Sequence, residues 1–176
     1  MILKRNQCLK NPDQNLNQIK RGNTMNRHNI IFDINYSYYL EEMFSTLTGR
    51  IHKLISVILF ILGGSVFTPF SNLLLFGAFV SCLSAIQYFY EYAKHSCFSN
   101  IQAKRYLALI YNESTLSDDE LHQKFNELQK SDTQCYGLLA NAAYKRTSIK
   151  LGLDDHTKLT RLESIFAWFA GDLPKA

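Results

Sequence analysis

The stretch from Leu54 to Tyr90 contains no Asp, Glu, Lys, Arg or His, although charged residues make up 19% of the whole chain. Helices that pack side by side in a soluble bundle keep a charged outer face, and this stretch offers none. We therefore favour helices that cross a membrane over the alternative, which is a pair of long buried helices in a soluble bundle.

The sequence also lacks the motifs of common catalytic and metal sites. Its four cysteines include no CxxC pair, and Cys82 lies inside the charge-free stretch, which favours reduced thiols over a zinc site or a disulfide framework. No HExxH, GxSxG or phosphate-loop motif occurs. The neighbouring residues Asp154, Asp155 and His156 do not converge on one ion and suit the start of a helix better. We therefore predict no enzyme activity, no metal and no cofactor.

Residues 1–30 lack the apolar segment of a signal peptide and are rich in Asn, Gln, Lys and Arg. They have too few apolar residues to bury, so we expect a polar, disordered segment, and Met25 remains open as an alternative start. The net charge of +4 is modest and the basic residues are scattered, which disfavours a nucleic-acid partner.

The charge-free stretch divides into two predicted membrane spans, about residues 54–70 and 73–90. Each is near the short end of what crosses a hydrocarbon core of roughly 30 Å. Pro69 and the Ser and Asn after it favour a tight turn, so the spans form a helical hairpin. Eight Lys and Arg precede the first span, eleven follow the second, and the turn has none. The positive-inside bias then predicts a multi-pass protein of the bacterial inner membrane, with both termini in the cytoplasm.

Small residues recur every four positions in both spans, a spacing that allows helices to approach closely in a bilayer. Two explanations remain open, packing within the hairpin and contact with a second copy in a homo-oligomer. The residues are Gly64 and Thr68 in the first span and Gly77, Ser81 and Ala85 in the second. The other polar residues are hydroxyls and one amide, and we expect each serine to bond to its own helix rather than to line a pore. They are Ser56, Ser65, Ser84 and Gln87.

Helices are predicted on both sides of the hairpin. An amphipathic helix capped by Asp33 or Asn35 is expected to run without a break into the first span, and the second span is expected to continue to about Asn112. Residues 31–112 would thus form one unit, and residues 113–176 a cytoplasmic helical region. Ser117 and Glu120 have the spacing of a capping box, the sharpest local signal in the sequence.

Two further helices are expected in the cytoplasmic region. One is capped by Ser131 or Asp132 and ends near Gly152. The last contains Trp168 and ends at Gly171. Its apolar side is expected either to pack on the other cytoplasmic helices or to lie in the membrane interface. The fold class is therefore all-α, with a two-helix transmembrane hairpin whose helices extend into a cytoplasmic helical domain.

This layout resembles the SLATT family of two-transmembrane effectors. The resemblance covers about residues 36–152. It lies in the amphipathic helix from Tyr39 to Lys53, the hairpin with a minimal turn, the basic and aromatic helix that leaves the membrane, the segment Phe125–Ser131 and the helix through Ala142, Ala143 and Tyr144. The family implies a membrane-permeabilising effector of a bacterial antiphage conflict system, regulated by a sensor or nucleotide-signalling partner, without catalytic residues.

Two functions are therefore expected in order of preference. The first is an oligomeric effector that permeabilises or depolarises the inner membrane. The second is a membrane scaffold or phage-exclusion protein without a pore, which binds a partner through its cytoplasmic helices. The absence of charge within the spans argues against a proton-coupled transporter.

Overall fold

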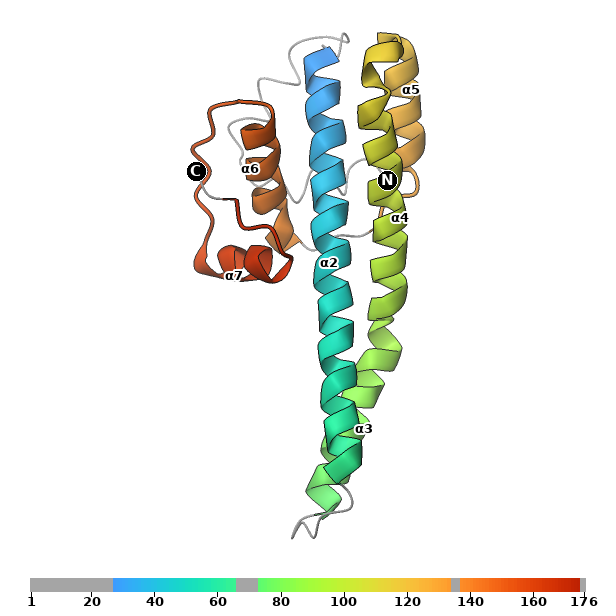
Figure 1. The fold of residues 1–176 in the computed structure, drawn as a ribbon, viewed down its shortest axis with the longest axis vertical. Coiled ribbons are helices and arrows are strands. Elements are labelled where there is room, and N and C mark those ends of the chain that lie inside the picture. Colours follow the sequence, from blue (N-terminus) through green and yellow to red (C-terminus); the bar gives the residue numbers. More distant parts are fainter. Residues whose placement is uncertain (1–26, 66–72, 134–136, 175–176) are drawn as a thin grey trace.

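The structure, a computed structural model, describes residues 27–65, 73–133 and 137–174, and these form helices without a strand (Figure 1). The predicted all-α class is therefore confirmed for this part of the chain. The elements are α2 (Arg27–Ser65), α3 (Leu73–Tyr90), α4 (Tyr92–Tyr111), η2 (Glu113–Thr115), α5 (Asp118–Gln129), η3 (Gly137–Leu139), α6 (Ala140–Lys150) and α7 (Arg161–Phe169).

Helix α2 runs unbroken for 39 residues, as the predicted continuity of the amphipathic helix with the first span requires. It begins at Arg27, so the prediction of an N-cap at Asp33 or Asn35 is wrong. Distant contacts extend the helix: the Arg27 guanidinium donates to the carbonyl of Leu116 at 3.2 Å and pairs with Asp118. Residues 27–30 thus belong to the helix rather than to the polar N-terminal segment.

The first half of α2 is the central helix of a broad helical body. On one side, Ile30 and Ile34 pack with residues of α4 and α5. On the other side, Met43, Phe44 and Leu47 pack with residues of α6 and α7. The second half of α2 leaves this body, and α3 returns beside it before α4 runs back along the first half (Figure 1).

Helices α2 and α4 make a close contact where both carry small residues. The Ser45 hydroxyl donates to the carbonyl of Ser96 at 2.9 Å, and the Ser96 hydroxyl donates to the carbonyl of Ser45 at 2.8 Å. A Cβ on Gly49 would lie 2.8 Å from the Ser96 oxygen. Glycine destabilises the interior of a helix, so another requirement must favour it here. At Gly49 that requirement is the close approach of Ser96 on α4, which a larger side chain would prevent.

Replacing Gly49 with leucine is expected to destabilise the protein by about 1–3 kcal/mol, because the larger side chain overpacks this contact. Thermal unfolding in detergent measures the effect. Gly63→Leu is the matched control, since Gly63 lies in the same helix and its Cβ would meet nothing within 4 Å. Equal unfolding temperatures for the two variants would contradict the close-contact role of Gly49.

The second predicted span does not continue smoothly to Asn112. Glu91 interrupts the helix with φ 42°, in the left-handed region, and α4 starts at the next residue. A left-handed conformation costs an ordinary residue of order 1–2 kcal/mol. The hydrophobic pattern of the sequence does not reveal this interruption.

The cap predicted at Ser131 or Asp132 for the helix after α5 is also wrong. Leu139 precedes α6, without a side-chain cap, whereas Asp132 accepts hydrogen bonds from α4. The helix does end as predicted, with Gly152 at φ 66° after its last turn. Ser117 accepts from the backbone of Glu120 in the predicted capping box.

Candidate functional site

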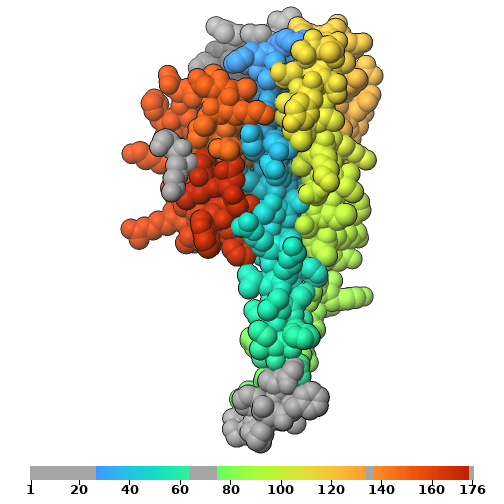
Figure 2. Space-filling model, in the orientation of Figure 1, coloured from blue at the N-terminus to red at the C-terminus, as the bar shows by residue number. Residues whose placement is uncertain are grey.

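The second half of α2 from Ile51 onward, together with α3, forms a narrow two-helix projection that we call the stem. Figure 2 shows it below the broader body. Large apolar side chains cover its outer surface, and Phe60 is 84% exposed. The others include Leu54, Val57, Ile61, Leu75, Phe79 and Ile86. A soluble protein rarely leaves so large an apolar surface in water.

One helix among the described residues is long and apolar enough to cross a membrane, judged by length and composition, and it spans Arg27–Gly63. Only 11% of its most apolar window is buried. A helix at the core of a soluble protein would be mostly buried there, so this half of α2 does not behave as a core helix. The part of the chain that the structure describes thus contains one candidate membrane-spanning helix.

The small residues of α3 lie on the outside of the stem. Gly77, Ser81 and Ala85 are exposed, whereas Phe76, Val80, Leu83 and Gln87 are the less exposed residues at helical spacing. A Cβ on Gly77 would meet nothing within 4 Å. Of the two explanations for these residues, their exposure favours contact with a second copy over packing within the hairpin. Gly64 lies within α2, and Thr68 and Pro69 lie outside the described residues.

The two helices of the stem are joined by a polar contact near its upper end. The Gln87 amide nitrogen donates to the Ser56 hydroxyl oxygen at 3.0 Å and lies 3.0 Å from Nδ1 of His52. Ser56 thus bonds to α3 across the stem, whereas the sequence favoured a bond to its own helix. His52 was not singled out from the sequence, and its register with Ser56 on one face of a helix would have been the available signal.

A buried polar network ties the body together at the connection between α5 and η3. The Glu41 carboxylate, fully buried on α2, accepts from the Thr133 amide at 2.9 Å and from the Thr133 hydroxyl at 2.7 Å. The Ser99 hydroxyl of α4 donates to the Thr133 hydroxyl at 2.9 Å. Burial raises the pKa of the Glu41 carboxyl, and its hydrogen bonds with Thr133 and Ser99 oppose that shift.

Asp132 extends this network toward the other end of α4. Its carboxylate accepts from the Tyr106 hydroxyl at 2.6 Å and from the Gln102 amide at 2.9 Å. The same Gln102 nitrogen donates to the carbonyl of Leu128 at the end of α5. We call Glu41, Ser99, Gln102, Tyr106, Asp132 and Thr133 the polar lock, because they hold the connection after α5 against both α2 and α4.

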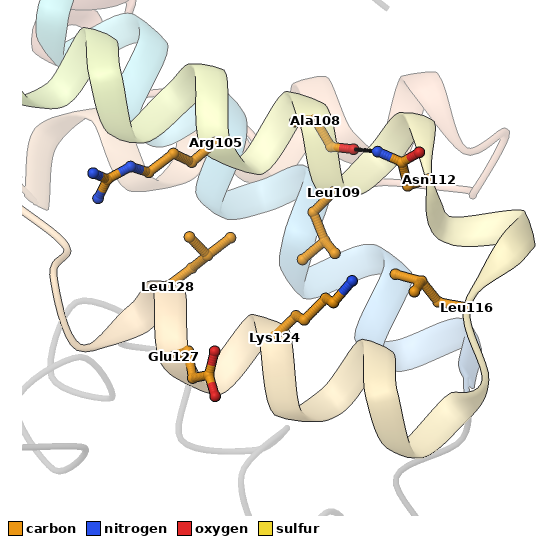
Figure 3. Close-up of a pocket in the computed structure, with 8 residues that line it drawn as sticks. All are labelled: Arg105, Ala108, Leu109, Asn112, Leu116, Lys124, Glu127 and Leu128. Carbon is orange, nitrogen blue, oxygen red and sulfur yellow. Dashed lines mark hydrogen bonds between the residues drawn. The ribbon is translucent and has the colours of Figure 1, made fainter.

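An open groove of about 440 Å³ lies between α4 and α5. Figure 3 shows Leu109, Leu116 and Leu128 lining it together with charged side chains. The charged residues are Arg105, Lys124 and Glu127. The groove thus offers apolar and charged side chains together.

No family model matches this chain, and neither the curated proteins nor the solved structures contain a match. The resemblance to the SLATT family therefore stays a prediction.

Proposed function

We propose that the protein is a bacterial inner-membrane effector whose stem crosses the bilayer as a two-span hairpin and whose copies associate to permeabilise the membrane. Both termini then lie in the cytoplasm. Its setting in antiphage defence, with a sensor or nucleotide-signalling partner as regulator, is part of the same proposal and follows from the resemblance to the SLATT family.

The observation that carries the proposal is the change of surface along α2. Its first half has buried faces on both sides of the body, whereas its second half exposes Leu54, Val57 and Phe60. The stem between Leu54 and Tyr90 contains no charge, and α3 also exposes Leu75 and Phe79. Hydrocarbon is the environment in which such a surface is stable.

Self-association is supported by the outward position of Gly77, Ser81 and Ala85. Residues of this size let helix backbones approach closely in lipid, where packing rather than water exclusion drives association. Because these residues are exposed on the stem, they are available to another copy of the chain.

Control by the cytoplasmic body is supported by the continuity of α2. The same helix carries Glu41 in the polar lock and Ser56 in the stem, without a break between them. A rearrangement of the body therefore changes the position of the stem directly.

The two native cysteines of the described helices test the membrane placement. With Cys8 and Cys135 replaced by serine, Cys97 on α4 is expected to react with a membrane-impermeant maleimide in inside-out vesicles. Cys82 on α3 is expected to react only after denaturation, although both side chains are exposed on the protein surface. Equal labelling of the two in intact vesicles would contradict the hairpin and the permeabilising role that depends on it.

A scaffold without a pore is the second candidate, and the groove between α4 and α5 is the observation that favours it. Leu109 and Leu128 offer apolar contact there, while Arg105 and Lys124 offer charge. A partner peptide bound in this groove would need the cytoplasmic body but no association of stems.

A further inference from the structure

Helix α7 has two different faces. Glu163, Ala167 and Ala170 are buried, and the two alanines pack in the cluster with Leu47 of α2. Thr160 and Glu163 fix the start of the helix through a capping box. The predicted packing of this segment on the cytoplasmic helices is therefore correct for one face only.

The opposite face of α7 is apolar and exposed. Leu162, Ile165 and Trp168 are 61%, 60% and 67% exposed and follow one another every three residues. Arg161 is also exposed beside them. Since the buried face anchors the helix, these side chains are held outward rather than left to fold back.

Helix α7 ends beside the point where the stem leaves the body. In Figure 1 the helix lies crosswise to α2, at the lower end of the α6–α7 side of the body. An Arg50 guanidinium nitrogen donates to the carbonyl of Phe169 at 2.8 Å, which fixes the end of α7 beside the last basic residues before the charge-free stretch. Phe169 lines a shallow hollow with Arg50, Lys53, Leu54 and Val57.

We infer that α7 is an interfacial helix, and that Leu162, Ile165 and Trp168 insert into the cytoplasmic surface of the same bilayer that the stem crosses. This inference rests on the proposed membrane placement of the stem. Helices of this kind lie in the membrane plane with apolar side chains among the headgroups and upper acyl chains. Tryptophan favours that region, because its ring is apolar and its N–H can bond to water or headgroups.

Two features select a lipid surface over a protein partner. The apolar face of α7 continues through Phe169 and the hollow onto Leu54 and Val57, so the same environment covers both. Arg50 and Lys53 lie at this level, where basic side chains attract the anionic headgroups of a cytoplasmic leaflet. The contact would hold the body against the membrane and limit its tilt relative to the stem.

The single tryptophan of the chain provides the test. The full chain is reconstituted in vesicles of phosphatidylethanolamine and phosphatidylglycerol, with bromine placed either near the headgroup or deep in the acyl chain. Trp168 emission is expected to shift to shorter wavelength relative to a water-exposed tryptophan, and to be lost more with shallow than with deep bromine. It should also be protected from acrylamide.

Two variants in a Trp168→Phe background calibrate the result. Phe60→Trp reports on the stem and should be quenched by bromine in the acyl chain. Tyr111→Trp, at the far end of α4 and exposed, should be quenched by acrylamide and not by brominated lipid. If Phe60→Trp is quenched by lipid while Trp168 behaves like Tyr111→Trp, the interfacial role of α7 is overturned and the proposed function stands. If Phe60→Trp escapes lipid quenching, the membrane stem itself is overturned.

Discussion

Replacing both Gly77 and Ser81 with leucine is expected to abolish membrane depolarisation while the protein stays in the membrane. Strong expression of the native chain in bacterial cells should collapse the membrane potential and release potassium, because associated stems breach the bilayer. The two leucines fill the outward stripe of α3 and keep neighbouring helices apart. A hydrogen bond between membrane helices, such as the Ser81 hydroxyl can make, contributes of order 1–2 kcal/mol, and close packing at Gly77 is lost as well. Association should therefore weaken about tenfold or more.

A voltage-sensitive dye, potassium efflux and cross-linking of the membrane fraction provide the measurements. Cys82→Leu and Gly63→Leu are the matched controls, because they add a leucine to exposed stem positions outside the Gly77–Ser81–Ala85 stripe. Both controls should depolarise as the native chain does. The proposed contact would be wrong if the Gly77→Leu and Ser81→Leu double variant also depolarised, or if it lost cross-linking no more than the controls.

Local signals in the sequence predicted those parts of the fold that depend on neighbours along the chain. Two local features follow from rules that involve a few consecutive residues. They are the capping box of Ser117 and Glu120 and the end of α6 shortly before Gly152. The helical class and the long apolar part of α2 follow from hydrophobic periodicity and the absence of charge.

Contacts between residues distant in the sequence explain why two predicted helix starts were wrong. Aspartate is a residue type that favours the N-cap position. The Asp132 carboxylate instead accepts hydrogen bonds from Tyr106 and Gln102 of α4. Arg27 starts α2 early because carbonyl and carboxylate acceptors in residues 113–118 lie beside it in the fold. No periodicity in the sequence encodes such pairings.

The candidate site on α3 could likewise be predicted only in part. The spacing of Gly77, Ser81 and Ala85 was visible, but the direction in which they face depends on how α3 rotates against α2. The contact that the structure does make through small residues, at Ser45, Gly49 and Ser96, joins a buried part of α2 to α4 and carries no hydropathy signal. A small-residue motif thus identifies a capacity for close approach and not the partner.

Removal of residues 113–176 is expected to convert the stem into a constitutive leak. The deletion takes away Leu121 and Phe125 from one side of α2, and Leu139 with the alanines of α6 and α7 from the other. It also removes Asp132 and Thr133, so the polar lock no longer holds α2 and α4 in one arrangement. The contact of Ser45 and Gly49 with Ser96 remains and keeps the truncated hairpin paired.

The expected result is depolarisation without any inducing signal, at an expression level at which the native chain leaves the membrane potential unchanged and with equal amounts of the two proteins in the membrane fraction. The same truncation with Gly77→Leu and Ser81→Leu is the matched control. It exposes the same apolar residues of α2 and α4, so a leak that it also produced would come from exposed core and not from association of stems. If the truncated chain is silent while the intact chain still binds a partner through the α4–α5 groove, the scaffold is the correct function. A leak that requires Gly77 and Ser81 but not residues 113–176 would show that the stems permeabilise the membrane and that the body controls them.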